Sequence, residues 1–506
     1  MHADVIVAGA GPTGLLLAAE LALAGVRVRV LERNETPTRQ SRALTLHPRS
    51  IEVMDLRGIA GRFLACGRTV PGWHFAGLDT RLDFTALDTR HGYTLFLEQA
   101  RTEELLDARA RELGAEIVRR CVVTAVRQEP DAVVVETSGG ETLRASYVVG
   151  CDGGRSLVRQ AAGIPFDGSD ETLTGMLGDF AVTGPGAVRA AGEHGVLAVP
   201  MEGGLTRFVI VDPERMRVPS GEPVTYEEFR RSLTSIAGTD FGIAEPRWLS
   251  RFGNATRQAG RYREGRILVA GDAAHVHFPA AGQGLNTGLQ DAMNLGWKLA
   301  AQVKGWAPEG LLDSYDAERR PVGAGVTANT EVQALLMELT LVPQYRRPAM
   351  ALREMLDGLL GIGEVNRRLA ASVSAIGTGY GPSAASVPAT LTGYGTLAGI
   401  RVPDLPVSVA ERPGAERLYE LLHDGRFLLL RAAVRSGPPA DSFAGPSADP
   451  PVGLDDRVAT VTATAWEPTA ELAGAEAVLV RPDGHLAWAG PLAEERDAVS
   501  HWVGPA

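Results

Sequence analysis

Several features common in other protein classes are missing from this sequence of 506 residues. It holds only three cysteines, Cys66, Cys121 and Cys151, and no CxxC pair. This argues against a disulfide-stapled secreted domain and a cysteine-based zinc site, so the cytoplasm is the expected compartment. No uninterrupted apolar run has the length of a membrane-spanning helix, and the opening Met-His-Ala-Asp lacks the positive charge of a secretory signal. We expect no stable membrane association.

Positive charge is also scarce. Lys and Arg total 50 against 61 Asp and Glu, which gives a net charge of −11 at pH 7. A general nucleic-acid binder needs a basic surface, so nucleic acid is not an expected partner. Arginine greatly outnumbers lysine, which suits local sites for phosphate or carboxylate groups. The length predicts two or three domains.

The first informative stretch is VIVAGAGPTGLLLAAELALAGVRVRVLER. It contains a buried strand at 4–7, a glycine turn, an Ala- and Leu-rich helix that ends near Gly25, and a second strand at 26–31 that ends at Glu32. A membrane helix is a poor explanation, because Glu20 lies in the middle of the run. The order of strand, glycine turn, helix, strand and acid is typical of a dinucleotide-binding unit.

The three glycines of this turn, Gly9-x-Gly11-x-x-Gly14, have separate tasks. Gly9 permits the tight turn, Gly11 lets a pyrophosphate approach the backbone, and Gly14 allows close packing. The helix N-terminus offers free N–H groups to the phosphates, and Glu32 can accept hydrogen bonds from a ribose. A glycine turn without a ligand is the alternative.

The second motif begins with another buried strand, at 147–150, which leads into Asp152 and a glycine turn. Arg155 and Arg159 follow on a short helix, one turn apart. Two arginines at a helix start suit phosphate binding. An ordinary charged surface helix is the alternative.

The third motif, GDAAHVHFPAAGQGLN at 271–286, follows a buried strand and runs into a long helix at about 284–304. Asp272 can accept a hydrogen bond from a polyol, and the helix N-terminus favours the negative charge that builds up on a reduced flavin ring. Sites for ribose, pyrophosphate, polyol and ring together describe FAD better than NAD. His275 and His277 lack a nearby third ligand, so structural or pocket-lining roles are favoured over a metal.

The remaining chain predicts an α/β protein with several parts. Short alternating runs among glycines and prolines predict an antiparallel sheet over 171–254 that forms a pocket wall. A stretch rich in Gly, Pro, Ser and Ala marks a linker at 376–400. We therefore predict a discontinuous Rossmann-like FAD-binding domain at 1–170 and 255–375 with a helical segment at 310–375, a substrate-binding domain at 171–254 with about 70–98, and a C-terminal α/β unit at 401–506.

Five apolar side chains are candidates for the lining of a pocket for a flat substrate. They are Trp73, Met176, Phe180, Met201 and Phe208. Ordinary core packing is the favoured interpretation of each.

The three motifs together resemble the fingerprints of the single-component FAD-dependent aromatic hydroxylases with the para-hydroxybenzoate hydroxylase fold. Within that family the chain is similar to bacterial aromatic polyketide hydroxylases and rifampicin monooxygenases. Matching segments at 41–42, 97–103, 252–257, 291–299 and 480–488 extend the resemblance over the whole chain. The last of them resembles the thioredoxin-like C-terminal domain of larger members. Because no cysteine follows Cys151, thiol exchange is excluded there, which leaves a structural or dimer-forming role and the option of a homodimer.

The resemblance implies FAD and NADPH as cofactors and assigns residues to them. Along FAD it places Gly9, Gly11, Pro12, Thr13, Gly14, Glu32, Arg33, Arg42, Gln99, Val123, Asp152, Asp272, Pro279, Gly282, Gly284, Leu285 and Asn286. At a transient NADPH docking site it places Arg42, Asp152, Arg155 and Arg159. Pro279 and the Gly282 loop lie beside the reacting ring, and no catalytic side chain is nominated.

The implied reaction uses NADPH and O2 and inserts one oxygen atom into a polycyclic aromatic substrate through a flavin C4a-hydroperoxide. Rifamycin-type antibiotic inactivation, epoxidation and Baeyer–Villiger insertion are alternatives within the family. A reductase without oxygen insertion and a flavin-carrying binding protein are alternatives outside that chemistry.

One residue departs from the family pattern. The loop often has the pattern Pro-x-Gly-Gly-Gln-Gly, and Ala281 replaces the first of those glycines. If that position needs a positive φ, the backbone is strained there.

Overall fold

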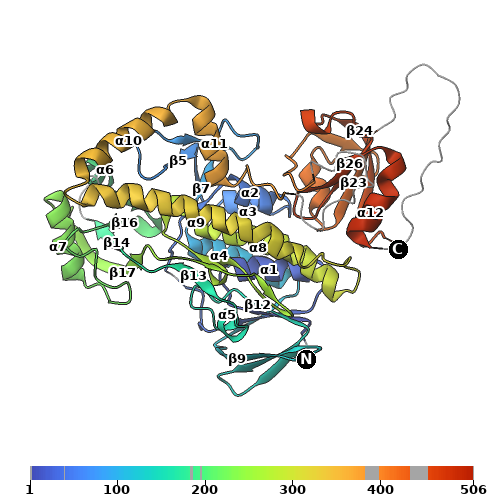
Figure 1. Cartoon of the computed structure of the whole chain (residues 1–506), viewed down its shortest axis with the longest axis horizontal. Coiled ribbons are helices and arrows are strands. Elements are labelled where there is room, and N and C mark those ends of the chain that lie inside the picture. The colour runs from blue at the N-terminus through green and yellow to red at the C-terminus, as the bar shows by residue number, and fades with distance from the viewer. Residues whose placement is uncertain are drawn as a thin grey trace.

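The structure is a computed structural model that describes residues 3–38, 40–182, 186–193, 196–381, 398–432 and 454–504. The N-terminal and central parts form one body that contains the long helices, and the C-terminal unit lies beside it (Figure 1). Among the described residues, no helix combines the length and the apolar character needed to cross a membrane.

A six-stranded sheet with the order β19-β20-β12-β1-β2-β8 forms the centre of the first body. All neighbouring pairs are parallel except the edge pair β19–β20. Its strands are β1 (Val5–Ala8), β2 (Val28–Glu32), β8 (Glu116–Arg119), β12 (Tyr147–Gly150), β19 (Arg263–Glu264) and β20 (Ile267–Val269). Strands β1, β12 and β20 are buried throughout, which explains their continuous apolar sequences and confirms the predicted buried strands.

Helices cover one face of this sheet. Helix α1 (Pro12–Leu23) packs against α4 (Gln99–Glu112) and α8 (Gln283–Val303). The carboxylate of Glu20, which interrupts the apolar sequence of α1, is buried in an ion pair with Arg57 at 2.6 Å. The pairing explains how a charge is tolerated inside the helical layer.

An antiparallel layer covers the other face. It consists of β9 (Val123–Gln128), β10 (Val133–Thr137) and β11 (Thr142–Ala145). Its apolar side packs with side chains of β1 and β2 in a shared core. The short helix α5 (Leu157–Ala161) contacts both β9 and β12.

The predicted pocket wall is a four-stranded antiparallel sheet with the order β15-β16-β14-β17. Its strands are β14 (Thr174–Val182), β15 (Leu197–Pro200), β16 (Leu205–Ile210) and β17 (Ile243–Gly253). Two helices in this region, α6 (Ala187–Glu193) and α7 (Tyr226–Ala237), were not predicted. Helix α7 begins at a Thr225 cap, ends before the left-handed Gly238 and covers the sheet with its apolar side, so its sequence contains helix signals that the strand prediction overlooked.

Smaller elements join these layers. They are β3 (Thr45–Leu46), β4 (Arg68–Val70), β5 (Gly72–Trp73), β6 (Leu82–Asp83), β7 (Thr94–Phe96), β13 (Phe166–Ser169), β18 (Thr256–Ala259), β21 (His275–Val276), α2 (Pro48–Asp55) and α3 (Ala60–Leu64).

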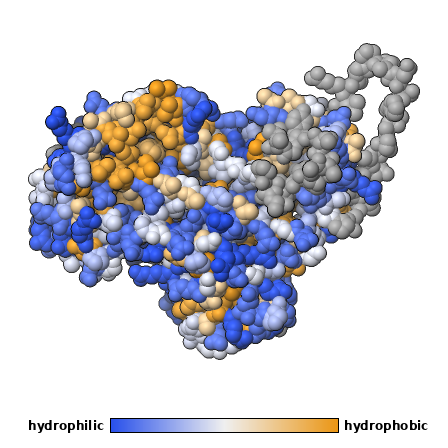
Figure 2. Space-filling model, in the orientation of Figure 1, coloured by the Kyte–Doolittle hydropathy of each residue, from blue (hydrophilic) through white to orange (hydrophobic). Residues whose placement is uncertain are grey.

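Three helices follow α8. They are α9 (Ser314–Leu341), α10 (Arg346–Leu360) and α11 (Gly363–Ser374), and α9 runs along the body beneath α10 in Figure 1. An apolar surface lies over this region (Figure 2). Its exposed large side chains are Val332, Leu335, Tyr345, Met350, Leu352, Met355, Leu359 and Ile362.

The C-terminal unit has a five-stranded sheet with the order β22-β24-β23-β25-β26. Its elements are β22 (Val407–Val409), β23 (Phe427–Ala432), β24 (Val458–Trp466), β25 (Ala477–Val480), β26 (Leu486–Gly490) and α12 (Glu495–Val503). The α/β character predicted for this unit is confirmed. Most of the predicted linker, at 382–397, lies outside the described residues.

Candidate active site

The first glycine turn connects β1 to α1. Gly9 has a φ of +102°, and a Cβ atom there would lie 2.4 Å from the carbonyl oxygen of Cys151. A Cβ at Gly14 would lie 2.1 Å from the carbonyl oxygen of Gly9, whereas a Cβ at Gly11 would meet nothing within 4 Å. Two glycines are therefore required by packing, and Gly11 leaves open space at the helix start. Pro12 occupies the first turn of α1, and no side chain caps this end of the helix. The free backbone N–H groups at the start of α1 are therefore available to a phosphate.

Glu32 ends β2 next to this turn, and its side chain is buried. Its carboxylate accepts hydrogen bonds from the backbone N–H groups of Ala10 and Asn34, both at 2.8 Å. Each oxygen keeps a further lone pair for a ribose hydroxyl. The adjacent Arg33 is exposed.

Further predicted residues lie around Glu32. Gln99 accepts a hydrogen bond from Ala43 N at 3.2 Å and donates one to Glu103 at 2.8 Å. Burial, together with the charge of Glu32, raises the pKa of Glu103 to about 7. Val123 begins β9, two residues after the N–H of Cys121 that donates to the backbone oxygen of Glu32.

The second motif contains an unsatisfied buried acceptor. One oxygen of Asp152 accepts hydrogen bonds from the backbone N–H groups of Leu157 at 2.8 Å and Val158 at 3.2 Å. The other oxygen, Oδ1, is buried and has no hydrogen-bond partner. Such an atom is costly unless a ligand donates to it. The residues fit FAD at the first motif, where Gly11 leaves open space and the start of α1 is uncapped.

The three motifs meet in space. The Oγ1 atom of Thr13 in the first motif would be 2.7 Å from a Cβ at Gly271 and 2.3 Å from one at Gly288. Arg159, after the second motif, donates to the backbone oxygens of Gly154 and Ala273, each at 3.0 Å. The meeting point lies at the ends of β1, β12 and β20, which are neighbours in the sheet.

The predicted arginines differ in their availability. Arg159 is buried, with its guanidinium 3.7 Å from the centre of the Phe166 ring. Its N–H groups bind backbone oxygens that link the second and third motifs, and its role in NADPH docking stays a prediction. Arg42 and Arg155 are exposed, and their roles in NADPH docking remain predictions.

The third motif has a left-handed backbone in its loop. Ala281 has a φ of +51° and Gly282 a φ of +68°. The departure from the family glycine therefore falls on a strained position. Asn286 stabilises the loop by donating to the backbone oxygens of Gly282 at 2.8 Å and Thr45 at 3.1 Å.

His47 also holds this loop, and sequence reasoning missed it. The Nε2 atom of this fully buried imidazole lies 2.7 Å from the backbone oxygen of Ala281, and its backbone N–H donates to Asn286 at 2.7 Å. Burial lowers the pKa of His47 to about 4, so the ring is neutral at pH 7. No motif includes this residue, and its sequence neighbours carry no sign of the contact.

Helix α8 begins directly after the loop. Gly282 supplies no side-chain cap, so the first N–H groups of the helix, from Gln283, Gly284 and Leu285, have no partner within the helix. The positive end of the helix dipole favours negative charge at this point. In the loop that precedes α8, Asp272 and Pro279 are exposed. Phe278 and Ala280 of the same loop pack in an apolar cluster.

The two histidines of this motif have different partners. His275 Nε2 lies 2.7 Å from Asp291, and His277 Nδ1 lies 2.8 Å from the backbone oxygen of Phe278. Within the described parts of the chain, no group of three or more His, Cys, Asp or Glu side chains could hold a metal ion.

Three of the five apolar pocket candidates are core residues. Met176, Phe180 and Phe208 are buried between the four-stranded sheet and α7, which agrees with the favoured interpretation. Trp73 and Met201 are half-buried. Trp73 lies 6.0 Å from the ring centre of His47 and packs on the cluster that includes Ala281.

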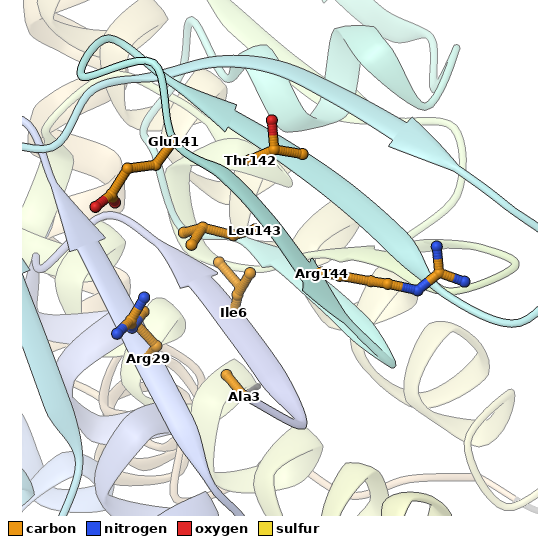
Figure 3. Close-up of a pocket in the computed structure, with 7 residues that line it drawn as sticks. All are labelled: Ala3, Ile6, Arg29, Glu141, Thr142, Leu143 and Arg144. Carbon is orange, nitrogen blue, oxygen red and sulfur yellow. The ribbon is translucent and has the colours of Figure 1, made fainter. Parts of the chain in front are cut away.

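A separate pocket of about 480 Å³ lies between β11 and the strands β1 and β2 (Figure 3). Its residues are Ala3, Ile6, Arg29, Glu141, Thr142, Leu143 and Arg144. None of them belongs to the glycine turn at 9–14, to the turn that follows Asp152, or to the loop at 271–286. Both arginines already have carboxylate partners, Glu116 for Arg29 and Glu129 for Arg144, so this pocket is not the cofactor site.

Comparisons with known proteins identify the family of this chain. A family model described as FAD binding domain matches residues 2–330, and one described as aromatic-ring hydroxylase, C-terminal, matches residues 395–506. A rifampicin monooxygenase of Streptomyces venezuelae is 46% identical over 97% of this chain and 96% of its own length. A 12-dehydrotetracycline 5-monooxygenase/anhydrotetracycline 6-monooxygenase of Streptomyces rimosus is 43% identical over 100% of this chain and 99% of its own.

A solved structure gives the same answer for the fold. The anhydrotetracycline hydroxylase from Streptomyces rimosus is 42% identical, covers 100% of both chains and has a TM-score of 0.86. This chain belongs to the FAD-dependent aromatic-ring hydroxylases and is an FAD-dependent monooxygenase.

Proposed function

We propose that the protein uses NADPH and O2 to insert one oxygen atom into a polycyclic aromatic substrate of the polyketide type. The observation that carries the proposal is the meeting of three cofactor motifs beside an apolar cluster, in a chain similar over its whole length to monooxygenases named for anhydrotetracycline and rifampicin. When bound, FAD supplies the electron transfer and the activation of O2, which no side chain can supply.

The residues of the chain have three tasks in this reaction. The N–H groups at the start of α8, which have no side-chain cap, would stabilise negative charge on a flavin ring bound there. The apolar cluster of Leu173, Phe278, Ala280 and Ala334 keeps water away from the reacting atoms. The exposed Arg42 and Arg155 offer charge to the phosphates of NADPH.

A rifamycin-type substrate is the second candidate, and it is favoured by the 46% identity to a rifampicin monooxygenase. The two candidates differ in substrate but share the cofactors and the oxygen insertion.

The test is a substrate panel with the purified FAD-loaded protein. Anhydrotetracycline-type polyketides and rifampicin are each added with NADPH, and NADPH oxidation, O2 uptake and product mass are followed. The proposal predicts faster NADPH oxidation with a polyketide and a product that gains one oxygen atom from labelled O2. Oxygen insertion into rifampicin alone supports the second candidate. NADPH oxidation without oxygen insertion into any compound contradicts both.

A further inference from the structure

A buried ion network connects the C-terminal unit to the FAD-binding domain. Arg481, just after β25, donates two hydrogen bonds to the carboxylate of Glu318 on α9, at 2.8 and 2.9 Å. Lys298 on α8 donates to the same carboxylate at 2.7 Å. The three side chains are at most 3% exposed. A carboxylate of the first body is therefore neutralised partly by the C-terminal unit.

The charges in this network balance. Asp483 pairs with Arg481 and accepts a hydrogen bond from Trp297 Nε1 at 3.2 Å, so two cations face two carboxylates. Burial alone would raise the pKa of Glu318, but Arg481 and Lys298 outweigh burial and hold this pKa at about 2. Glu318 is thus ionised, and this ionised state depends on both Arg481 and Lys298.

Arg319, the residue after Glu318, is connected to the third motif through Asp291. Arg319 donates to Asp291 on α8 at 2.7 Å and to the backbone oxygen of Thr287 at 3.2 Å. The other oxygen of Asp291 accepts hydrogen bonds from Gly271 N at 3.1 Å and from His275 at 2.7 Å. Asp291 and Arg319 are fully buried. Adjacent residues of α9 therefore connect the C-terminal unit with the start of the third motif.

We propose that the C-terminal unit is a positioning unit for the FAD site and that Arg481 is its positioning residue. By neutralising Glu318, Arg481 fixes α9 against α8, and this places Arg319 and Asp291 to hold Gly271 and His275. Removing one partner of a buried ion pair leaves an uncompensated charge, which forces the helices to shift or admit water. Because this positioning task requires no cysteine, it is compatible with a C-terminal unit that cannot perform thiol exchange. The inference rests on the FAD site and not on the identity of the substrate.

The experiment compares two substitutions in the full-length protein. Arg481→Met removes the cation at the boundary and keeps the aliphatic part of the side chain. Arg431→Met is the matched control, because Arg431 pairs with Glu495 at 2.6 Å inside the C-terminal unit. The dissociation constant of FAD is measured by fluorescence titration of the apoprotein, and the visible flavin spectrum of the loaded protein is recorded. Arg481→Met is expected to weaken FAD binding about tenfold and to alter the spectrum, whereas Arg431→Met changes neither.

A second variant keeps the proposal testable if Arg481→Met does not fold. The double variant Glu318→Gln and Arg481→Met restores the charge balance, with Lys298 and Asp483 left as one cation and one anion. It is expected to bind FAD within about threefold of the unaltered protein. Wild-type FAD affinity in Arg481→Met, or a double variant that binds FAD as weakly as the single variant or fails to fold, overturns the proposal.

Discussion

The imidazole of His47 lies 2.7 Å from the backbone oxygen of Ala281, and it donates a hydrogen bond to a residue in the left-handed region. The neutral ring must carry its proton on Nε2 to do so, which leaves Nδ1 as the acceptor for Thr94 Oγ1 at 3.2 Å. A strained alanine in the loop of the third motif is thus held by a residue distant in sequence.

His47→Phe removes both hydrogen bonds and preserves the aromatic shape. It leaves the Ala281 oxygen and the Thr94 hydroxyl unpaired, so we expect a loss of about 2 kcal/mol in the free energy of unfolding. Urea denaturation measures this loss. His74→Phe is the control, since burial also lowers the pKa of His74 to about 4 but its Nδ1 has no partner. Equal losses in the two variants would contradict the role of His47.

Ala281→Gly tests how much strain the loop contains. Relief of the left-handed conformation gains about 1–2 kcal/mol, whereas loss of the buried methyl group costs about 0.8 kcal/mol and glycine adds about 0.5–1 kcal/mol of chain entropy. These effects nearly cancel, so the free energy of unfolding should change by less than about 1 kcal/mol. A stabilisation well above this, in the same denaturation experiment, would show additional strain at Ala281.

Gly11→Ala and Gly14→Ala form a pair that separates cofactor binding from folding. A Cβ at Gly11 meets nothing in the protein, so the variant should unfold like the parent but lose FAD affinity at least tenfold. A Cβ at Gly14 lies 2.1 Å from a backbone oxygen, so this variant should lose both stability and FAD affinity. Calorimetry of the apoprotein and FAD titration give the two readouts. Normal FAD affinity in Gly11→Ala would mean that no phosphate approaches the backbone there.

The raised pKa of Glu103 predicts that the stability of the folded protein depends on pH. Its pKa is raised from 4.5 to about 7 in the folded protein, mainly by burial. The folded state therefore binds more protons than the unfolded state between these values, and stability should fall as the pH rises through this window. The full effect is on the order of 3 kcal/mol. Glu103→Gln should remove this slope, and Glu104→Gln, an exposed neighbour, should keep it.

Arg155 and Arg159 should respond differently to substitution. Arg155→Ala is expected to raise the KM for NADPH severalfold with an unchanged Tm, because the side chain is exposed. Arg159→Ala should lower the Tm, because two backbone oxygens lose their donor. Steady-state kinetics and thermal melts test both. An unchanged KM in Arg155→Ala would remove this residue from the docking site.

Much of the site follows from local sequence. The spacing of Gly9, Gly11 and Gly14 encodes the turn that the structure contains, because Gly9 and Gly14 meet local steric demands and Gly11 leaves the backbone open. Position 281 is a similar case, since its backbone angle could be inferred from the missing glycine.

Other features depend on contacts between distant segments. The roles of His47 and Arg481 arise only when residues far apart in the chain pack together. The hydrogen bond from Arg159 to the backbone oxygen of Ala273 arises in the same way, because the two residues belong to different motifs. Helix α7 is a different case, because its sequence carries local helix signals that were overlooked: a Thr225 cap, acidic residues in the first turn and Gly238 at its end.

The flavin content of the purified protein tests the central claim most directly. We predict yellow protein, or apoprotein that becomes yellow when FAD is added, with one FAD bound per chain and with binding lost in Gly11→Ala. Protein that binds no FAD under either condition would contradict the conclusion that the three motifs form a single cofactor site.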